Sequence, residues 1–313
     1  MKPSLVTVDV DVAVAALTAG GLVAIPTETV YGLGADADDP VAVGRIFDVK
    51  RRPRGHPLIV HIAGADRLGE WAADVPRSAA VLAATCWPGP LTVLVERAAR
   101  VLDEVTGGRD TVAVRVPAHP LTEQLLVRSG RGIAAPSANR FGRPSPTTAG
   151  HVVADLGDTL DPARDVILDG GPCPVGVEST IVDCTADPPQ VLRPGGVATE
   201  DVERLLGAST APAAGPSRAA GMLASHYAPS ATVVLADDLA TADRLARHSA
   251  DGGLRVDVED FTGDLVAAAQ RLYDVLRGAD GRGLDQLIAV LPPPRGLGHA
   301  IRDRLTKAAA PRP

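Results

Sequence analysis

Four short stretches of the sequence combine hydroxyl, basic and glycine residues in a way that suits nucleotide binding. The first is PTETVYGLG, residues 26–34, which follows the apolar residues 22–25. The apolar residues predict a short buried strand, so the threonines come at its carboxyl end, where α/β proteins bind ligands. A plain turn between a strand and a loop is the alternative interpretation.

The second stretch is basic. KRRPRGHP occupies residues 50–57, and between Arg45 and Arg54 five basic residues stand against one acid, Asp48. The whole chain carries a net charge of −7, so this local excess of positive charge is an anomaly that suits a polyphosphate. A solvated run of charges after a helix would give the same pattern.

The third stretch, APSAN, spans residues 135–139 and is followed by Ser145. Ser137 and Asn139 are two apart, so in an extended segment their side chains point the same way. Ser145 precedes Pro146, which predicts a helix that begins there and runs to Leu156. The free N–H groups of such a helix end favour anions, although an ordinary N-cap serine fits equally well.

The fourth stretch is VESTIVD, residues 177–183, followed by RPGG at residues 193–196. An arginine before Pro-Gly-Gly is usually part of a turn. Beside a nucleotide pocket, Arg193 could instead bind a phosphate with two hydrogen bonds.

Other common signatures are missing from the sequence. It contains no GxxxxGK[ST], HExxH or GxSxG pattern. The three cysteines, Cys86, Cys173 and Cys184, are far apart, so neither a zinc site nor a disulfide framework is predicted, and we expect no metal ligands from the protein. Aromatic residues make up 3% of the chain, which predicts a core of Val, Leu, Ile and Ala.

Strand and helix patterns alternate along the chain and predict an α/β fold in which helices cover a twisted sheet. Thirteen of the fifteen residues in 207–221 are Ala, Gly, Pro or Ser, which is typical of a linker. Three further strand–helix units follow and predict a small Rossmann-like domain without a GxGxxG motif. The predicted organisation is a catalytic domain over residues 1–206, a linker and lid over 207–229, and a C-terminal domain over 230–313.

Together these stretches resemble the YrdC family of L-threonylcarbamoyladenylate synthases in its longer, two-domain form. The resemblance covers about residues 10–229 and rests on PTETVYGLG, the Lys50-x-Arg52 pair, the Ser137-x-Asn139 pair and GMLASHYAP at residues 221–229. The C-terminal domain fits by size and pattern only. The resemblance implies a YrdC-like twisted mixed sheet with a basic concave cleft.

Carried over residue by residue, the resemblance implies two sets of contacts. Lys50 and Arg52 would neutralise charge during catalysis. The ATP contacts would be Lys50, Arg52, His56, Thr111, Ser137, Asn139, Ser145, Arg193 and Tyr227, and the threonine contacts would be Thr29, His61, Arg115 and Ser179. His56 departs from the family, which commonly has Asn there, although both side chains form hydrogen bonds.

The resemblance also implies the reaction and its partners. L-threonine, bicarbonate and ATP with Mg²⁺ would give threonylcarbamoyl-AMP and pyrophosphate, and a downstream tRNA threonylcarbamoyl transferase would use the adenylate. Because no signal-peptide core or 18-residue apolar span occurs, we expect a cytoplasmic protein without a membrane contact.

Two other functions remain compatible with parts of the sequence. A non-enzymatic RNA-binding or ribosome-maturation module would use the same basic cleft, and a weak RNA contact is possible in either case, but a small pocket explains the Thr, Ser and Asn residues better. Carbamoyl transfer from carbamoyl phosphate is the other, ranked lower because zinc-finger-like cysteine spacing and an acylphosphatase-like extension are missing.

Overall fold

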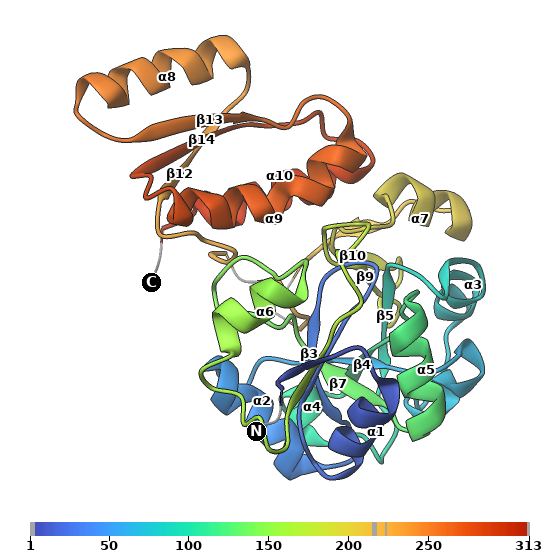
Figure 1. Cartoon of the computed structure of the whole chain (residues 1–313). Helices are drawn as coiled ribbons and strands as arrows, with labels where there is room; N and C mark the ends of the chain where they lie inside the picture. The colour runs from blue at the N-terminus through green and yellow to red at the C-terminus, as the bar shows by residue number, and fades with distance from the viewer. Residues whose placement is uncertain (1–3, 215–217, 223, 312–313) are drawn as a thin grey trace.

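The computed structural model describes residues 4–214, 218–222 and 224–311. The described chain forms two α/β parts joined by the segment around residues 207–229, of which residues 215–217 and 223 lie outside the described set (Figure 1). Within the described residues, no helix is both long enough and apolar enough to cross a membrane.

The larger part is built on one mixed sheet of eleven strands, in the spatial order β1-β8-β2-β3-β7-β4-β6-β5-β9-β10-β11. The sheet contains both parallel and antiparallel pairs, for example β2 antiparallel to β3 and β4 parallel to β6. The strands are β1 (Val6–Thr7), β2 (Val23–Ile25), β3 (Gly32–Asp36), β4 (Ile59–His61), β5 (Leu91–Glu96), β6 (Thr111–Arg115), β7 (Ile133–Ala135), β8 (Val166–Leu168), β9 (Thr180–Asp183), β10 (Gln190–Arg193) and β11 (Ala211–Pro212).

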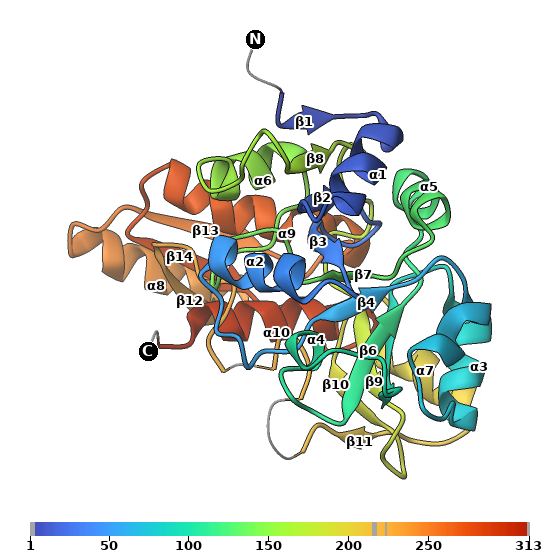
Figure 2. The same cartoon turned by 90° about the horizontal axis from the view of Figure 1, so that it is seen from below.

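Short helices cover this sheet, as Figure 2 shows from a second direction. Their amphipathic faces supply an aliphatic core in which Leu, Val, Ile and Ala dominate, as the composition predicted. The helices are α1 (Val10–Thr18), α2 (Pro40–Lys50), the 3₁₀ turn η1 (Ala65–Glu70), α3 (Arg77–Cys86), α4 (Asp103–Thr106), α5 (Pro120–Ser129), α6 (Ala149–Leu156) and α7 (Thr199–Leu206).

The PTETVYGLG stretch, residues 26–34, contains a turn and then the start of a second strand, so it forms a hairpin with β2. β2 ends at Ile25, residues 26–31 turn, and β3 returns antiparallel beside it. Gly34 permits this because an added Cβ would lie 2.5 Å from Cγ2 of Ile133 on the neighbouring β7. The prediction missed β3 because a glycine-rich strand has little hydrophobic pattern.

The helix predicted to begin at Ser145 begins later. α6 starts at Ala149, and its N-cap is Thr148, whose side chain accepts a hydrogen bond from the His151 N–H. Ser145 therefore does not lie at a helix N-terminus: the predicted start of the helix is wrong, and the free N–H groups of a helix end are not found at Ser145.

The smaller part is the predicted Rossmann-like unit. Its sheet has the order β12-β14-β13, and all strands are parallel. α8 covers one face, while α9 and α10 cover the other and face the larger part (Figure 1). The elements are β12 (Thr232–Ala236), α8 (Leu239–Asp251), β13 (Val256–Asp260), α9 (Leu265–Gly281), β14 (Gln286–Val290) and α10 (Leu297–Ala309).

α9 begins at Leu265, after a short loop that follows β13. Asp264 is its N-cap, and the carboxylate accepts hydrogen bonds from the N–H groups of Val266 and Ala267. Phe261 lies before the helix, fully buried in the core of the smaller part.

Candidate active site

One pocket on the larger part collects most of the predicted site residues. It lies where the turn between β2 and β3, the ends of β4, β6, β7, β9 and β10, and residues 220–227 meet. Eight predicted residues line it: Thr29, Arg52, His61, Arg115, Ser137, Ser179, Arg193 and Tyr227. Because these residues come from segments far apart in sequence, the fold brings the four stretches together.

At the deep end of the pocket, Arg115 holds the turn that follows β2. Its Nη1 donates to the Thr29 hydroxyl at 2.9 Å, and its Nε donates to the Gly89 carbonyl at 3.1 Å. Its Nη2 lies 2.7 Å from a carboxylate oxygen of Glu28, and both side chains are buried. Glu28, for which the sequence pattern predicted no role, fixes the position of this arginine.

His61 and Arg115 are register partners on β4 and β6, so their side chains reach the same end of the pocket. Burial, and next the nearby Arg115, lower the pKa of His61 to about 3. Its Nδ1 lies 3.3 Å from the Ile133 carbonyl oxygen. His61 is therefore a neutral hydrogen-bonding group at ordinary pH.

Arg193 and Ser179 form the opposite wall. Nε and Nη2 of Arg193 donate to the Ser179 carbonyl at 3.1 and 2.9 Å, and Nη2 also donates to the Ser179 hydroxyl at 3.1 Å. The Ser179 hydroxyl lies 2.7 Å from that of Thr92. Nη1 of Arg193 donates to the Ala220 carbonyl at 3.2 Å, which ties this wall to the segment between the two parts.

Ser137 lines the pocket, but Asn139 and Lys50 lie behind it. The Lys50 ammonium is buried and donates to the carbonyl of Ser137 at 2.5 Å and to that of Asn139. The Asn139 amide donates to the carbonyls of Arg140 and Arg143 at 2.8 and 2.7 Å. The chain bends after Ser137, so the expected parallel orientation of Ser137 and Asn139 is not found.

A second hollow adjoins the first and shares Arg52, Ala220, Gly221 and His226 with it. His56 lines this second hollow, and its ring makes an edge contact with Phe141 at 5.4 Å. Burial, together with Arg52 and Arg109, lowers the pKa of His56. The two hollows therefore form a continuous basic path from Arg193 past Arg52 to His56.

Glu178 is a lining residue that the sequence analysis quoted without a role. Ser145 donates to it at 2.5 Å, Tyr273 of α9 at 2.7 and 2.8 Å, and Nε of Arg304 in α10 at 2.9 Å. Burial raises the pKa of Glu178, but Arg304, Arg193 and these hydrogen bonds outweigh burial and hold it at about 2. The carboxylate is charged at every ordinary pH.

The segment after the predicted linker closes the remaining side of the pocket. His226 and Tyr227 both line it, and both are buried. The His226 N–H donates to the Lys307 carbonyl at 3.2 Å, and the Lys307 ammonium donates to the Gly221 carbonyl at 2.6 Å. Helix α10 therefore anchors this segment at Gly221 and at His226, and we call its described residues, 218–222 and 224–227, the lid.

Two predicted ATP contacts lie elsewhere. Thr111 is at the opposite end of β6 from Arg115 and lines a separate hollow with Glu96 and Arg97. Ser145 is fully buried and donates its hydroxyl to Glu178. Neither residue lines the pocket described above, and a contact between either one and ATP stays a prediction.

The pocket is small in this conformation, with a volume of about 50 Å³. Pockets for drug-sized ligands commonly measure ≈300–1,000 Å³. In this conformation the pocket is therefore smaller than a whole nucleotide. Within the described residues, no group of three or more His, Cys, Asp or Glu side chains could hold a metal ion.

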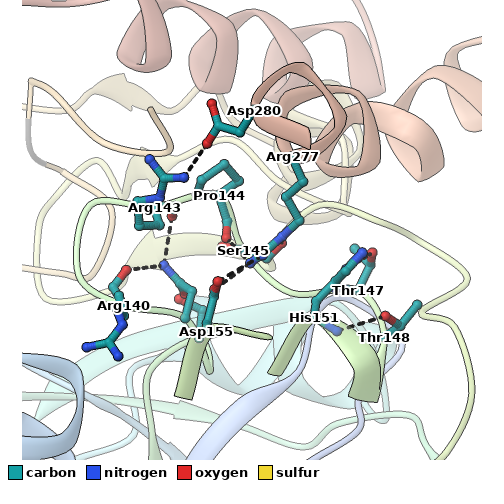
Figure 3. A network of polar contacts seen from close by, with 12 residues as sticks. Arg140, Arg143, Pro144, Ser145, Thr147, Thr148, His151, Asp155, Arg277 and Asp280 are labelled. Atoms are coloured by element: carbon teal, nitrogen blue, oxygen red, sulfur yellow. Dashed lines mark hydrogen bonds and ion pairs between the residues drawn. The ribbon is translucent and has the colours of Figure 1, made fainter. Parts of the chain in front are cut away.

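The smaller part is held against the larger by a polar interface next to the pocket. Figure 3 shows Arg277 of α9 reaching Asp155 of α6, at 2.7 Å, and the carbonyls of Pro144 and Ser145. Arg143 pairs in the same interface with Asp280. None of these six residues lines the pocket.

Comparison of the sequence with known families gives two matches that together cover nearly the whole chain. Residues 15–195 match the family Sua5_yciO_yrdC, described as "Telomere recombination". Residues 197–310 match Sua5_C, described as "Threonylcarbamoyl-AMP synthase, C-terminal domain".

Individual relatives agree with these matches. The threonylcarbamoyl-AMP synthase of Pyrococcus abyssi is 41% identical over 93% of this chain and 91% of its own, and that of Bacillus subtilis is 40% identical over 96% and 92%. The crystal structure of P. abyssi Sua5 complexed with L-threonine superimposes with a TM-score of 0.91 at 39% identity, covering 96% of this chain and 94% of that one.

Proposed function

The chain belongs to the Sua5/YrdC family of threonylcarbamoyl-AMP synthases in its two-domain form, and from this premise we propose that its pocket binds L-threonine and ATP side by side. The family's activity is the formation of threonylcarbamoyl-AMP, and this chain performs it as a transferase of tRNA modification. The convergence of Thr29, Arg115, Ser179, Arg193 and Arg52 on one pocket is the observation that carries the proposal.

L-threonine occupies the deep end in this proposal. Arg115 provides the fork geometry that suits a carboxylate, and Glu28 holds it in place. The hydroxyls of Thr29 and Ser179, with the neutral His61, provide hydrogen bonds for the amine and hydroxyl of the substrate. The P. abyssi relative was crystallised with L-threonine, which supports a threonine site in this fold.

ATP occupies the outer end. Arg52 and Arg193 face the pocket, and in the part of the chain that the structure describes neither forms an ion pair with a carboxylate. The triphosphate runs along the basic path towards His56. Mg²⁺ arrives with the nucleotide as part of the substrate, because it prefers phosphate oxygens and water as ligands.

The reaction needs positioning and charge stabilisation more than a protein nucleophile. The threonine amine adds to carbon dioxide derived from bicarbonate and loses a proton, which gives a carbamate. A carbamate oxygen then attacks the α-phosphorus of ATP, and pyrophosphate leaves. Arg52 stabilises the charge that builds up on the leaving group. A direct phosphate contact by Lys50 stays a prediction, because its ammonium here binds the Ser137 and Asn139 carbonyls.

The lid protects the carbamate from water while the reaction proceeds. Tyr227 lies under Arg304, 5.5 Å from its guanidinium carbon to the ring centre, so lid closure is coupled to α10. In this proposal the lid opens for ATP, closes over both substrates and opens again for the adenylate.

Threonine binding in solution tests the assignment of the deep end. Thr29→Val keeps the side-chain shape and removes the hydroxyl that Arg115 contacts. Calorimetry should show threonine affinity falling roughly tenfold, the typical effect of losing one charge-assisted hydrogen bond. Unchanged affinity would remove Thr29 from the threonine site.

The remaining partners are proposals of the same kind. We place the enzyme in the cytoplasm, with bicarbonate as the carbon source and a tRNA threonylcarbamoyl transferase as the recipient of the adenylate. The alternative of an RNA-binding module loses support because Arg52 lines a small pocket. A weak RNA contact elsewhere on the surface stays a prediction.

A further inference from the structure

A buried carboxylate faces the site proposed for a triphosphate, and its charge requires an explanation. Glu178 lines the pocket within electrostatic reach of Arg193. An uncompensated negative charge there would repel ATP and would cancel part of the attraction of Arg52 and Arg193.

The compensation comes from the C-terminal part. Arg304 is completely buried in α10, and its Nε donates to a Glu178 oxygen at 2.9 Å. Tyr273 of α9 donates to the same carboxylate. Arg304 also donates to the Pro194 carbonyl at 2.6 Å, directly after Arg193.

We propose that Arg304 is a positioning residue that neutralises Glu178 and so gives the pocket the net positive charge that ATP binding requires. The four charged lining residues are Arg52, Arg115, Arg193 and Glu178. Glu28 pairs with Arg115, and Arg304 pairs with Glu178. Two cationic charges, on Arg52 and Arg193, then remain for the phosphates. Without Arg304, Glu178 would offset one of them.

This role explains why the C-terminal part contributes to a site that it does not line. No residue of α9 or α10 belongs to the pocket lining, but both helices hold Glu178 from behind. The inference rests on the proposed function, because it assumes that ATP binds beside Glu178.

The test compares ATP affinity in the full-length protein. Arg304→Met removes the compensating charge, while Ser145, Tyr273 and Arg193 still favour the ionised form of Glu178. We expect MgATP to bind on the order of thirtyfold more weakly by calorimetry at pH 8, as is common when one partner of a buried charge pair is truncated. The KM for ATP should rise more than the KM for threonine.

A variant with two substitutions distinguishes an effect of charge on ATP affinity from an effect of packing. Glu178→Gln combined with Arg304→Met removes both charges, so ATP affinity should return to within about threefold of the wild type, as expected for directly coupled sites. Arg277→Met is the matched control, because it also removes an interdomain arginine–carboxylate pair but touches no pocket residue (Figure 3). It should leave ATP affinity unchanged within about twofold.

Two results would overturn the inference while leaving the proposed function intact. One is equal ATP affinity in the Arg304→Met and Arg277→Met proteins. The other is a double variant that binds ATP as weakly as Arg304→Met, which would make the effect one of packing. A wild-type protein that binds no ATP would instead contradict the proposed function itself.

Discussion

Arg52 and Arg54 lie two residues apart in the same basic run but do different things. Arg52 is partly buried and lines both hollows, with its Nη2 donating to the Pro57 carbonyl at 3.2 Å. Arg54 is exposed and pairs with Asp48 at 2.7 Å. The basic run alone does not distinguish the two arginines, the family resemblance selects Arg52, and the structure has Arg52 in the pocket lining.

This difference provides a matched pair of variants. Arg52→Ala should lower kcat/KM for ATP about ten- to hundredfold, because it removes a charge-assisted phosphate contact of roughly 1.5–3 kcal/mol. Arg54→Ala, which removes the same charge from the same run, should stay close to the wild type. Steady-state kinetics at saturating threonine measure both, and equal losses would mean that the run acts through its overall field alone.

The low pKa of Glu178 predicts an effect of acid on stability. Its folded pKa of about 2 lies below the ordinary value, so it stabilises the fold above about pH 4.5, and this stabilisation is lost as the pH falls towards 2. The melting temperature of the wild type should therefore fall more steeply between about pH 5 and pH 3 than that of Glu178→Gln. Parallel curves for the two proteins would show that Glu178 is not held in its charged form.

At the scale of elements, the end of a strand could be predicted from the sequence, but the contacts that its neighbouring side chains make could not. The strand at residues 22–25 follows from an apolar run that ends at a proline, and the structure has β2 there. Ser145 was wrongly predicted to begin a helix, because its surroundings depend on tertiary contacts. Ser145 bonds to Glu178, which is 33 residues away in sequence, and no local pattern contains that information.

The roles of two buried glutamates were not predicted for the same reason, which is that they depend on tertiary contacts. Glu28 and Glu178 stand inside stretches that the sequence analysis quoted, but a carboxylate in a site for anions had no evident purpose there. Each is paired with an arginine from a distant segment, Arg115 or Arg304. Their partners become visible only when the sheet and the C-terminal helices are in place.

The lid is the element whose movement the account requires. Tyr227→Ala removes the ring that closes the pocket, and we expect it to lower threonine-dependent turnover roughly tenfold or more, since water then reaches the carbamate. Tyr31→Phe is the control, because Tyr31 is equally buried but bonds to Gly171 outside the pocket. If both variants turn over at the wild-type rate, the lid does not protect the intermediate.

At the scale of the whole molecule, the two parts work as one unit around the pocket. The larger part supplies every residue of the wall except the lid, and α10 anchors the lid through Lys307 and holds Glu178 through Arg304. The sequence predicted the Rossmann-like form of the smaller part from its three strand–helix units. It did not predict the contacts of α9 and α10, because amphipathic patterns show that a helix face is buried and not what covers it.

The most direct test of the account is the substrate requirement of pyrophosphate release by the full-length protein. The account predicts that release requires L-threonine, bicarbonate, Mg²⁺ and ATP together, and that mass spectrometry detects threonylcarbamoyl-AMP in equal amount. Omission of any one substrate should reduce release to background. Pyrophosphate release that continues unchanged without threonine or without bicarbonate would contradict it.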